Sequence, residues 1–195
     1  MGRLYYEDLY LLANQDIAVN FLMSKVMSSL HLICVENARQ SGSFNLGIGF
    51  PQYSKEKKSL GAVIRLYSED SSLLAKTAGD NRLRRLEDYI KINEVKEAPE
   101  SALGYKQYRR LQFKENKERL MRRYAKRHQT DIQQAQKDYA GFTPVKNHLP
   151  YIVLDSLSSG HRFRLYIEEV QLKEDAGDPV FNSYGLTSSG SLPAF

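Results

Sequence analysis

The chain has 195 residues, of which 42% are hydrophobic, so it is long enough for one or two domains with buried cores. Its 28 Lys and Arg residues exceed its 23 Asp and Glu residues, giving a formal net charge of +5 at pH 7. The single cysteine, Cys34, excludes an intrachain disulfide and a cysteine-based zinc site. Because no signal peptide and no apolar run of about 20 residues is evident, we expect a soluble, cytoplasmic protein that does not contact a membrane.

The first half of the chain predicts alternating strands and helices. Residues 4–12, rich in Tyr and Leu, are typical of a strand. In residues 16–39 apolar side chains recur at helical spacing and form a core stripe, namely Leu22, Val26, Leu30 and Ile33. Further strands are expected at 44–50, 60–67 and 89–95, with a helical region at 70–87 that breaks near Gly79. This order, βαββαβ, is the ferredoxin-like arrangement that also underlies common RNA-binding modules.

The second half begins after a linker around Pro99, so we predict two domains, residues 1–98 and 99–195. The second domain is expected to open with a basic strand that carries Arg110 and Gln112 on one face. An Arg-rich helix that Asn116 caps should come next. A shorter helix should follow, opened by a capping box at 130–133 and closed by Gly141. Strands are expected at 151–156, 161–169 and 180–186. The predicted fold class is therefore α+β, with an N-terminal ferredoxin-like domain and a C-terminal α+β domain.

Positive charge is concentrated in residues 105–128. This stretch contains ten Lys and Arg against two Glu, whereas the other 171 residues carry 18 basic and 21 acidic side chains. A local positive element on a nearly neutral body is typical of a surface that binds a polyanion.

Within this stretch the predicted helix has a basic face and an apolar face. At about 100° per residue, the basic face carries Arg119, Arg122, Arg123, Lys126 and Arg127. Such faces are usually only solvated. A solvated helix, however, normally alternates Glu with Lys, whereas cations stacked on one face repel each other. We therefore predict that this face binds nucleic acid or another phosphate polyanion.

The sequence has no HExxH motif, carboxylate cluster or Gly-rich phosphate loop. If the chain cuts RNA, we therefore expect it to use no metal or other cofactor, with the RNA's own 2′-hydroxyl as nucleophile. The attacking 2′-hydroxyl has to lose its proton, and histidine suits this transfer because its pKa lies near the working pH. The candidates are His31, His128, His148 and His161, and position alone does not choose among them.

Several segments in a fixed order resemble one family. They are SSLH before residue 32, RRLQ at 109–112, the Arg-rich helix, LDSLSSGHRFRLYI at 154–167, and FNSYGL at 181–186 with a final Pro-x-Phe. Together they closely resemble the CRISPR repeat-processing endoribonuclease of type I-F systems. Members combine an N-terminal ferredoxin-like domain with a C-terminal domain bearing an Arg-rich helix. The resemblance covers most of the chain and is strongest after Tyr105.

The resemblance implies an activity and partners. The chain would be a metal-independent endoribonuclease of antiviral defence that binds the CRISPR repeat RNA hairpin and cuts at the 3′ base of the stem. The products would carry a 5′-hydroxyl and a 2′,3′-cyclic phosphate. The mature crRNA would stay bound, with the chain acting as one subunit of the type I-F surveillance complex. A non-catalytic, structural RNA-hairpin-binding protein is the alternative interpretation.

The resemblance also implies catalytic roles. His31 matches the histidine that handles the 2′ proton, and Ser156 matches the serine that holds the ribose. Ser158 matches a second serine with a lesser role, and Tyr184 a tyrosine that helps place the histidine. Without the resemblance, the serines would be interpreted as turn formers and Tyr184 as a core residue.

Nine residues are expected to bind RNA. Arg110 and Gln112 match side chains that read base edges low in the stem, and Phe163 matches an aromatic that stacks on the terminal base pair. On the helix, the predicted contacts are Arg119, Arg122, Arg123, Lys126, Arg127 and His128.

Two positions depart from the family pattern. Lys126 stands where arginine is usual, and a lysine lacks the bidentate fork. Asp155 adds negative charge before Ser156 unless Arg162 or Arg164 offsets it.

Overall fold

The computed structural model describes residues 3–99, 103–113, 117–141, 147–156 and 160–195. The chain divides into two compact units, one made of residues 1–111 and 149–195 and the other of residues 112–148. The described residues contain five helices and antiparallel sheets, which confirms the mixed α+β class. This division does not coincide with the predicted boundary between residues 98 and 99, since the first unit contains elements from both sides of it. The predicted boundary stays a prediction.

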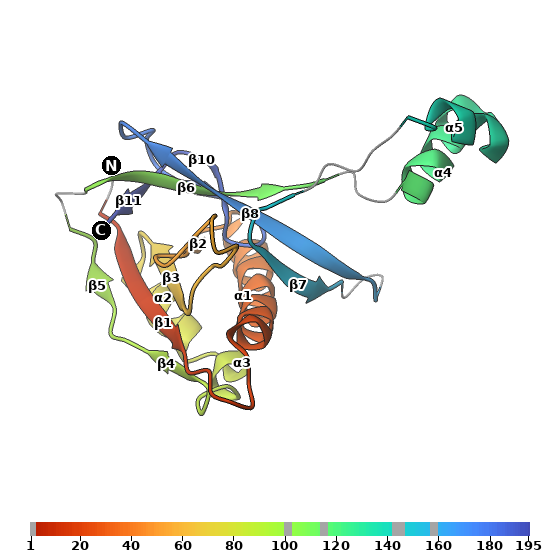
Figure 1. The fold of residues 1–195 in the computed structure, drawn as a ribbon. Helices are drawn as coiled ribbons and strands as arrows, with labels where there is room; N and C mark the ends of the chain where they lie inside the picture. Colours follow the sequence, from red (N-terminus) through yellow and green to blue (C-terminus); the bar gives the residue numbers. More distant parts are fainter. Residues whose placement is uncertain (1–2, 100–102, 114–116, 142–146, 157–159) are drawn as a thin grey trace. The chain divides into compact units, whose positions relative to one another are not determined.

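The first sheet has the strand order β2-β3-β1-β4, and every neighbouring pair is antiparallel (Figure 1). Its strands are β1 (Tyr5–Leu11), β2 (Gly47–Gly49), β3 (Val63–Ser68) and β4 (Ile90–Ile92), and the short β5 (Lys96–Glu97) also pairs with β1. The described elements of this part follow each other as β1, α1, β2, β3, α2, α3 and β4, in the order that the sequence predicts.

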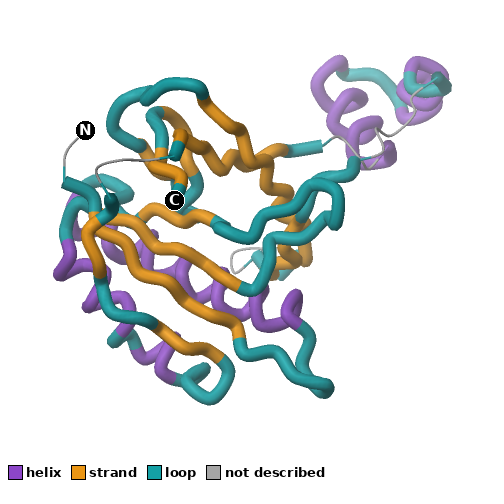
Figure 2. The backbone as a smooth tube through the Cα atoms, turned by 60° about the vertical axis from the view of Figure 1, so that its left-hand side comes forward, coloured by secondary structure: helices purple, strands orange, loops and turns teal. Residues whose placement is uncertain are grey.

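Two helices, α1 (Val19–Ser41) and α2 (Ser71–Ala78), cover one face of this sheet (Figure 2). The predicted stripe of α1 is confirmed, since all four of its members are buried. The helical region breaks at Gly79 as expected because Asp80 caps a new short helix, α3 (Asn81–Arg84), by accepting a hydrogen bond from the backbone N–H of Arg82. None of the helices in the described ranges combines the length and apolar character that crossing a membrane requires.

A second antiparallel sheet has the order β11-β6-β8-β7. Its strands are β6 (Gly104–Leu111), β7 (Tyr151–Asp155), β8 (Arg162–Leu172) and β11 (Leu192–Ala194). The two sheets share one apolar core, in which the edge of the Tyr108 ring meets Phe50 at 5.5 Å between ring centroids. The Tyr108 hydroxyl also donates a hydrogen bond to the Phe50 carbonyl at 3.0 Å. The C-terminal strands thereby pack on the N-terminal sheet, and β7 lies against α1.

The second unit contains α4 (Lys117–His128) and α5 (Ile132–Asp138), which share a small core of Met121, Ala125 and Ala135. Two details of the predicted α5 are wrong. Its N-cap is Asp131 rather than Thr130, because the Asp131 carboxylate accepts the backbone N–H of Gln134 at 2.7 Å. The helix also ends at Asp138, before Gly141. The predicted cap of α4, Asn116, lies outside the described residues.

The predicted strand at 180–186 is also wrong. Strand β9 (Val180–Phe181) is followed by a turn, and the chain resumes as β10 (Thr187–Ser189), which pairs with β9. The turn forms because Gly185 adopts a φ of +68° and because the Asn182 side chain accepts backbone N–H groups that a strand would give to a neighbour.

Candidate active site and nucleic-acid interface

His31 lies on α1, half-buried between the fully buried Leu30 and the buried Cys34. Its Nδ1 is 2.7 Å from the carbonyl oxygen of Ser183, which is 152 residues further along the chain. A carbonyl oxygen only accepts hydrogen bonds, so Nδ1 carries the proton. In the neutral ring Nε2 then keeps its lone pair, which is the state that a general base needs.

The Tyr184 ring stacks on the His31 ring. The ring centroids are 4.3 Å apart and the planes differ by 13°. A carbonyl at one nitrogen and a ring against one face together restrict both the tilt and the rotation of the imidazole. The structure therefore brings together His31 and Tyr184, two of the predicted catalytic residues.

Phe163 on β8 and Arg110 on β6 belong to the same cluster. The Phe163 ring meets Tyr184 edge-on, with centroids 6.4 Å apart. The guanidinium carbon of Arg110 is 5.1 Å from the Tyr184 centroid and 5.9 Å from the Phe163 centroid. Four residues predicted to act on RNA are thus joined by side-chain contacts.

Ser156 follows β7, the strand that packs against α1. Its backbone N–H donates to the His161 carbonyl at 2.9 Å, and its own carbonyl accepts the N–H of Gly160 at 2.7 Å. The neighbouring Asp155 pairs with Arg162 at 3.1 Å, both side chains being exposed, so of the two arginines considered Arg162 is the one that offsets this negative charge. The predicted Ser158 lies outside the described residues.

Helix α4 shows the predicted division into two faces. Met121 and Ala125 are buried, whereas the exposed positions are Arg122, Arg123, Lys126, Arg127 and His128. Arg119 lies in α4, but its side chain is outside the described set. The ion pair between Glu118 and Arg122 on this helix is weak, because the two side chains are 3.8 Å apart and both are exposed. Most of this positive charge therefore faces solvent.

Gln112 does not lie in a strand. Strand β6 ends at Leu111, so the expected alternation of Arg110 and Gln112 on one strand face is wrong. Arg110 belongs to the first compact unit, whereas the exposed Gln112 belongs to the second.

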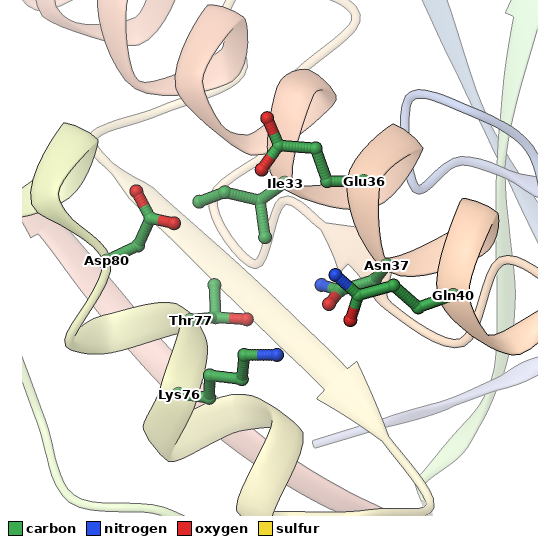
Figure 3. A pocket seen from close by; sticks show the side chains of 7 residues that line it. All are labelled: Ile33, Glu36, Asn37, Gln40, Lys76, Thr77 and Asp80. Atoms are coloured by element: carbon green, nitrogen blue, oxygen red, sulfur yellow. The ribbon is translucent and has the colours of Figure 1, made fainter.

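Other candidate chemistry is limited. Burial raises the pKa of the Cys34 thiol to about 12, so it stays protonated and is a poor nucleophile. Among the described residues, no three His, Cys, Asp or Glu side chains are grouped so that they could hold a metal ion. A pocket of about 110 Å³ lies between α1 and α2, and the side chains that line it are mostly polar (Figure 3). Its two carboxylates, Glu36 and Asp80, both pair with Arg82.

The Ser183 carbonyl and the Asn182 side chain were not among the predicted site residues. A backbone carbonyl has no signature in the sequence, because every residue carries one. The turn that presents it did have a signal, namely Asn followed by Gly three residues later in Asn182–Gly185.

Comparison with known proteins identifies the family. Residues 6–195 match the family model described as "CRISPR-associated protein (Cas_Csy4)". The chain is 30% identical over 191 residues to the CRISPR-associated endonuclease Cas6/Csy4 of Pseudomonas aeruginosa (strain UCBPP-PA14), covering 98% of this chain and 99% of that protein. It is 29% identical, with the same coverage, to the CRISPR-associated endonuclease Cas6/Csy4 of Escherichia coli (strain UTI89 / UPEC). The chain therefore belongs to the Csy4 family of CRISPR-associated proteins.

Proposed function

We propose that this protein is a metal-independent endoribonuclease that binds the hairpin of CRISPR repeat RNA and cuts at the 3′ base of its stem. The observation that carries the proposal is the 2.7 Å contact between His31 Nδ1 and the Ser183 carbonyl oxygen. Because the carbonyl can only accept, this contact assigns the proton to Nδ1 and leaves Nε2 available as a base. The two full-length relatives named as CRISPR-associated endonucleases support a nucleic-acid-cutting reaction.

In the proposed reaction His31 Nε2 takes the proton of the 2′-hydroxyl next to the scissile phosphate. The 2′ oxygen forms a bond to phosphorus while the bond to the 5′ oxygen breaks, and that oxygen takes up a proton from water. The hydroxide left by that water then receives the proton held on His31 Nε2, which returns the histidine to its neutral state. The products are a 2′,3′-cyclic phosphate and a 5′-hydroxyl. Ser156 would hold the ribose, Ser158 would assist it, and Phe163 would stack on the terminal base pair.

Binding of the stem is assigned to α4 and to Arg110 with Gln112. The exposed cations of α4 face solvent with little competition from acidic groups, which suits them to bind phosphates. The A-form major groove is too narrow for side chains except near a loop or a stem end, so a short hairpin fits this helix better than a long duplex. The mature crRNA would then remain bound, with this chain as a subunit of the type I-F surveillance complex.

The proposed organisation is a ferredoxin-like domain over residues 1–98 and an RNA-hairpin-binding domain with an Arg-rich helix over residues 99–195. The antiparallel order β2-β3-β1-β4 with both helices on one face supports the first assignment.

The test compares the wild-type protein with His31→Ala on a repeat RNA hairpin that keeps its flanking nucleotides, in excess EDTA. We expect the wild type to cut once, leaving the two ends named above, and His31→Ala to bind with unchanged Kd but to lose cleavage by at least about a hundredfold. His148→Ala, which removes an exposed histidine of the second unit, is the matched control.

Each other outcome changes a defined part of the proposal. Binding without cleavage by the wild type would favour the non-catalytic hairpin-binding protein. Cleavage that stops in EDTA would overturn metal independence, and equal loss of binding and cleavage in His31→Ala would overturn the proton-transfer role. Isolation of the tagged protein from its source cells without crRNA or other protein subunits would overturn membership of the surveillance complex.

A further inference from the structure

The residues around Asn182 form a turn that its own side chain closes. The Gly185 N–H donates to the Asn182 carbonyl at 2.8 Å, and the Asn182 N–H donates to the Leu186 carbonyl at 3.0 Å. The Asn182 Oδ1 accepts the backbone N–H of Tyr184 at 2.8 Å and that of Leu186 at 3.3 Å. One amide oxygen therefore binds both residues that flank Gly185.

The Ser183 carbonyl and the Tyr184 ring, which both contact His31, lie inside this turn. Ser183 supplies the carbonyl that accepts from Nδ1, and Tyr184 supplies the stacked ring. The Tyr184 N–H that Asn182 binds belongs to the peptide unit whose carbonyl is that of Ser183. Because this unit is planar, holding its N–H also orients its C=O toward His31.

The far side of the turn is fixed to β2. The Gly185 carbonyl accepts the Ile48 N–H at 2.7 Å, and a Cβ on Gly185 would lie 2.6 Å from Ile48 Cγ1. Nearer the start of the turn, the Asn182 side chain holds the backbone by accepting the Tyr184 N–H. Removing that side chain would free the Ser183–Tyr184 peptide unit, whereas the hydrogen bond between Ile48 and Gly185 would stay intact.

We propose that Asn182 is a positioning residue for the RNA cleavage proposed above, and the inference rests on that function. Its Oδ1 orients the peptide unit between Ser183 and Tyr184, so that the carbonyl holds the proton on His31 Nδ1 and the ring holds the imidazole plane. Asn182 acts through these two residues, and its effect is on which nitrogen of His31 is free to accept the 2′ proton.

The test uses the full chain as wild type, Asn182→Ala and Asn182→Asp, in which the carboxylate keeps an acceptor at the same place. Asn14→Ala is the matched control, because the Asn14 Oδ1 also accepts two backbone N–H groups, from Asp16 and Ile17, in the loop before α1. Long-range ¹⁵N NMR of histidine-labelled protein reports the His31 tautomer without RNA, with His31→Ala assigning the signal. Single-turnover cleavage is measured against pH, and Kd is measured with a hairpin that carries a 2′-deoxy nucleotide at the cut.

We expect Asn182→Ala to lose part of the Nδ1–H tautomer of His31 and to cut at least about tenfold more slowly than wild type across the pH profile. Its Kd for the hairpin should stay within about twofold of the wild-type value. Asn14→Ala should behave like wild type in all three measurements. Asn182→Asp should keep the Nδ1–H tautomer of His31, because its carboxylate accepts the same two backbone N–H groups. Retention of both the tautomer and the rate in Asn182→Ala, in protein that still binds the hairpin, would overturn the inference. If the wild type does not cut at all, the proposed function fails, whereas the tautomer measurement still decides the role of Asn182.

Discussion

The guanidinium of Arg110 lies over the ring of Tyr184, 5.1 Å from its centroid. Tyr184 in turn stacks on His31. The side chain proposed to read a base and the histidine proposed to move a proton therefore contact the same ring.

Arg110→Ala should weaken binding of the cognate hairpin by about five- to 150-fold, the range expected for one bidentate base contact. It should also reduce the preference for the cognate hairpin over one whose lower-stem G·C pairs are inverted. Filter-binding or fluorescence titrations with both hairpins measure this. The control is Arg109→Ala, which removes the same charge from the exposed neighbour on the other strand face. An equal loss in both variants would mean that Arg110 contributes only charge.

The Tyr184 prediction separates its ring from its hydroxyl. Tyr184→Phe keeps the stack on His31, so we expect single-turnover cleavage within about threefold of wild type, whereas Tyr184→Leu should lose about tenfold or more. Both variants should bind an uncleavable hairpin normally. A large loss in Tyr184→Phe would instead assign the role to the hydroxyl.

Arg123 is predicted to contact a phosphate from the exposed face of α4. Arg123→Ala should weaken hairpin binding, and the slope of log Kd against log salt should fall by about one, because one fewer counterion is released. Lys137→Ala on α5 removes an exposed cation from the same unit and should leave the slope unchanged. Identical slopes for wild type and Arg123→Ala would remove Arg123 from the interface.

We expect Glu7 on β1 to make stability depend on pH. Its side chain is buried, and its Oε2 has no hydrogen-bond partner among the described residues. Burial raises the pKa of this carboxyl from 4.5 to about 7. Between these values the folded chain binds more protons than the unfolded chain, so the free energy of unfolding falls as pH rises. Above pH 7 the carboxyl is ionised in both states, and this decrease levels off.

Glu7→Gln has no charge to bury, so its stability relative to wild type should rise between pH 5 and pH 8, by up to roughly 3 kcal/mol. Urea denaturation at the two pH values measures the difference. Glu56→Gln, in an exposed loop, should follow the wild type. The same pH dependence in Glu7→Gln and wild type would show that Glu7 ionises normally in the folded chain.

The local elements were largely predictable from sequence. The stripe of α1 and the break at Gly79 depend on side-chain spacing and on a helix cap, which are properties of neighbouring residues. The failures were also local. Residues 180–186 looked like a strand because Val180, Phe181 and Leu186 are apolar, and the turn chemistry of Asn182 and Gly185 outweighed that pattern.

For the site, sequence by itself determined which residue types are present: a histidine on a helix, an Arg-rich helix and the segment FNSYGL at 181–186, in an order that resembles a known family. Only the tertiary structure decided that the Ser183 carbonyl meets His31 across 152 residues and that Arg110, Phe163 and Tyr184 form one cluster. The physical reason is that tautomer and ring orientation depend on a backbone carbonyl and a ring face. These groups come together only when the turn after β9 is held against α1 by the packing of the whole unit.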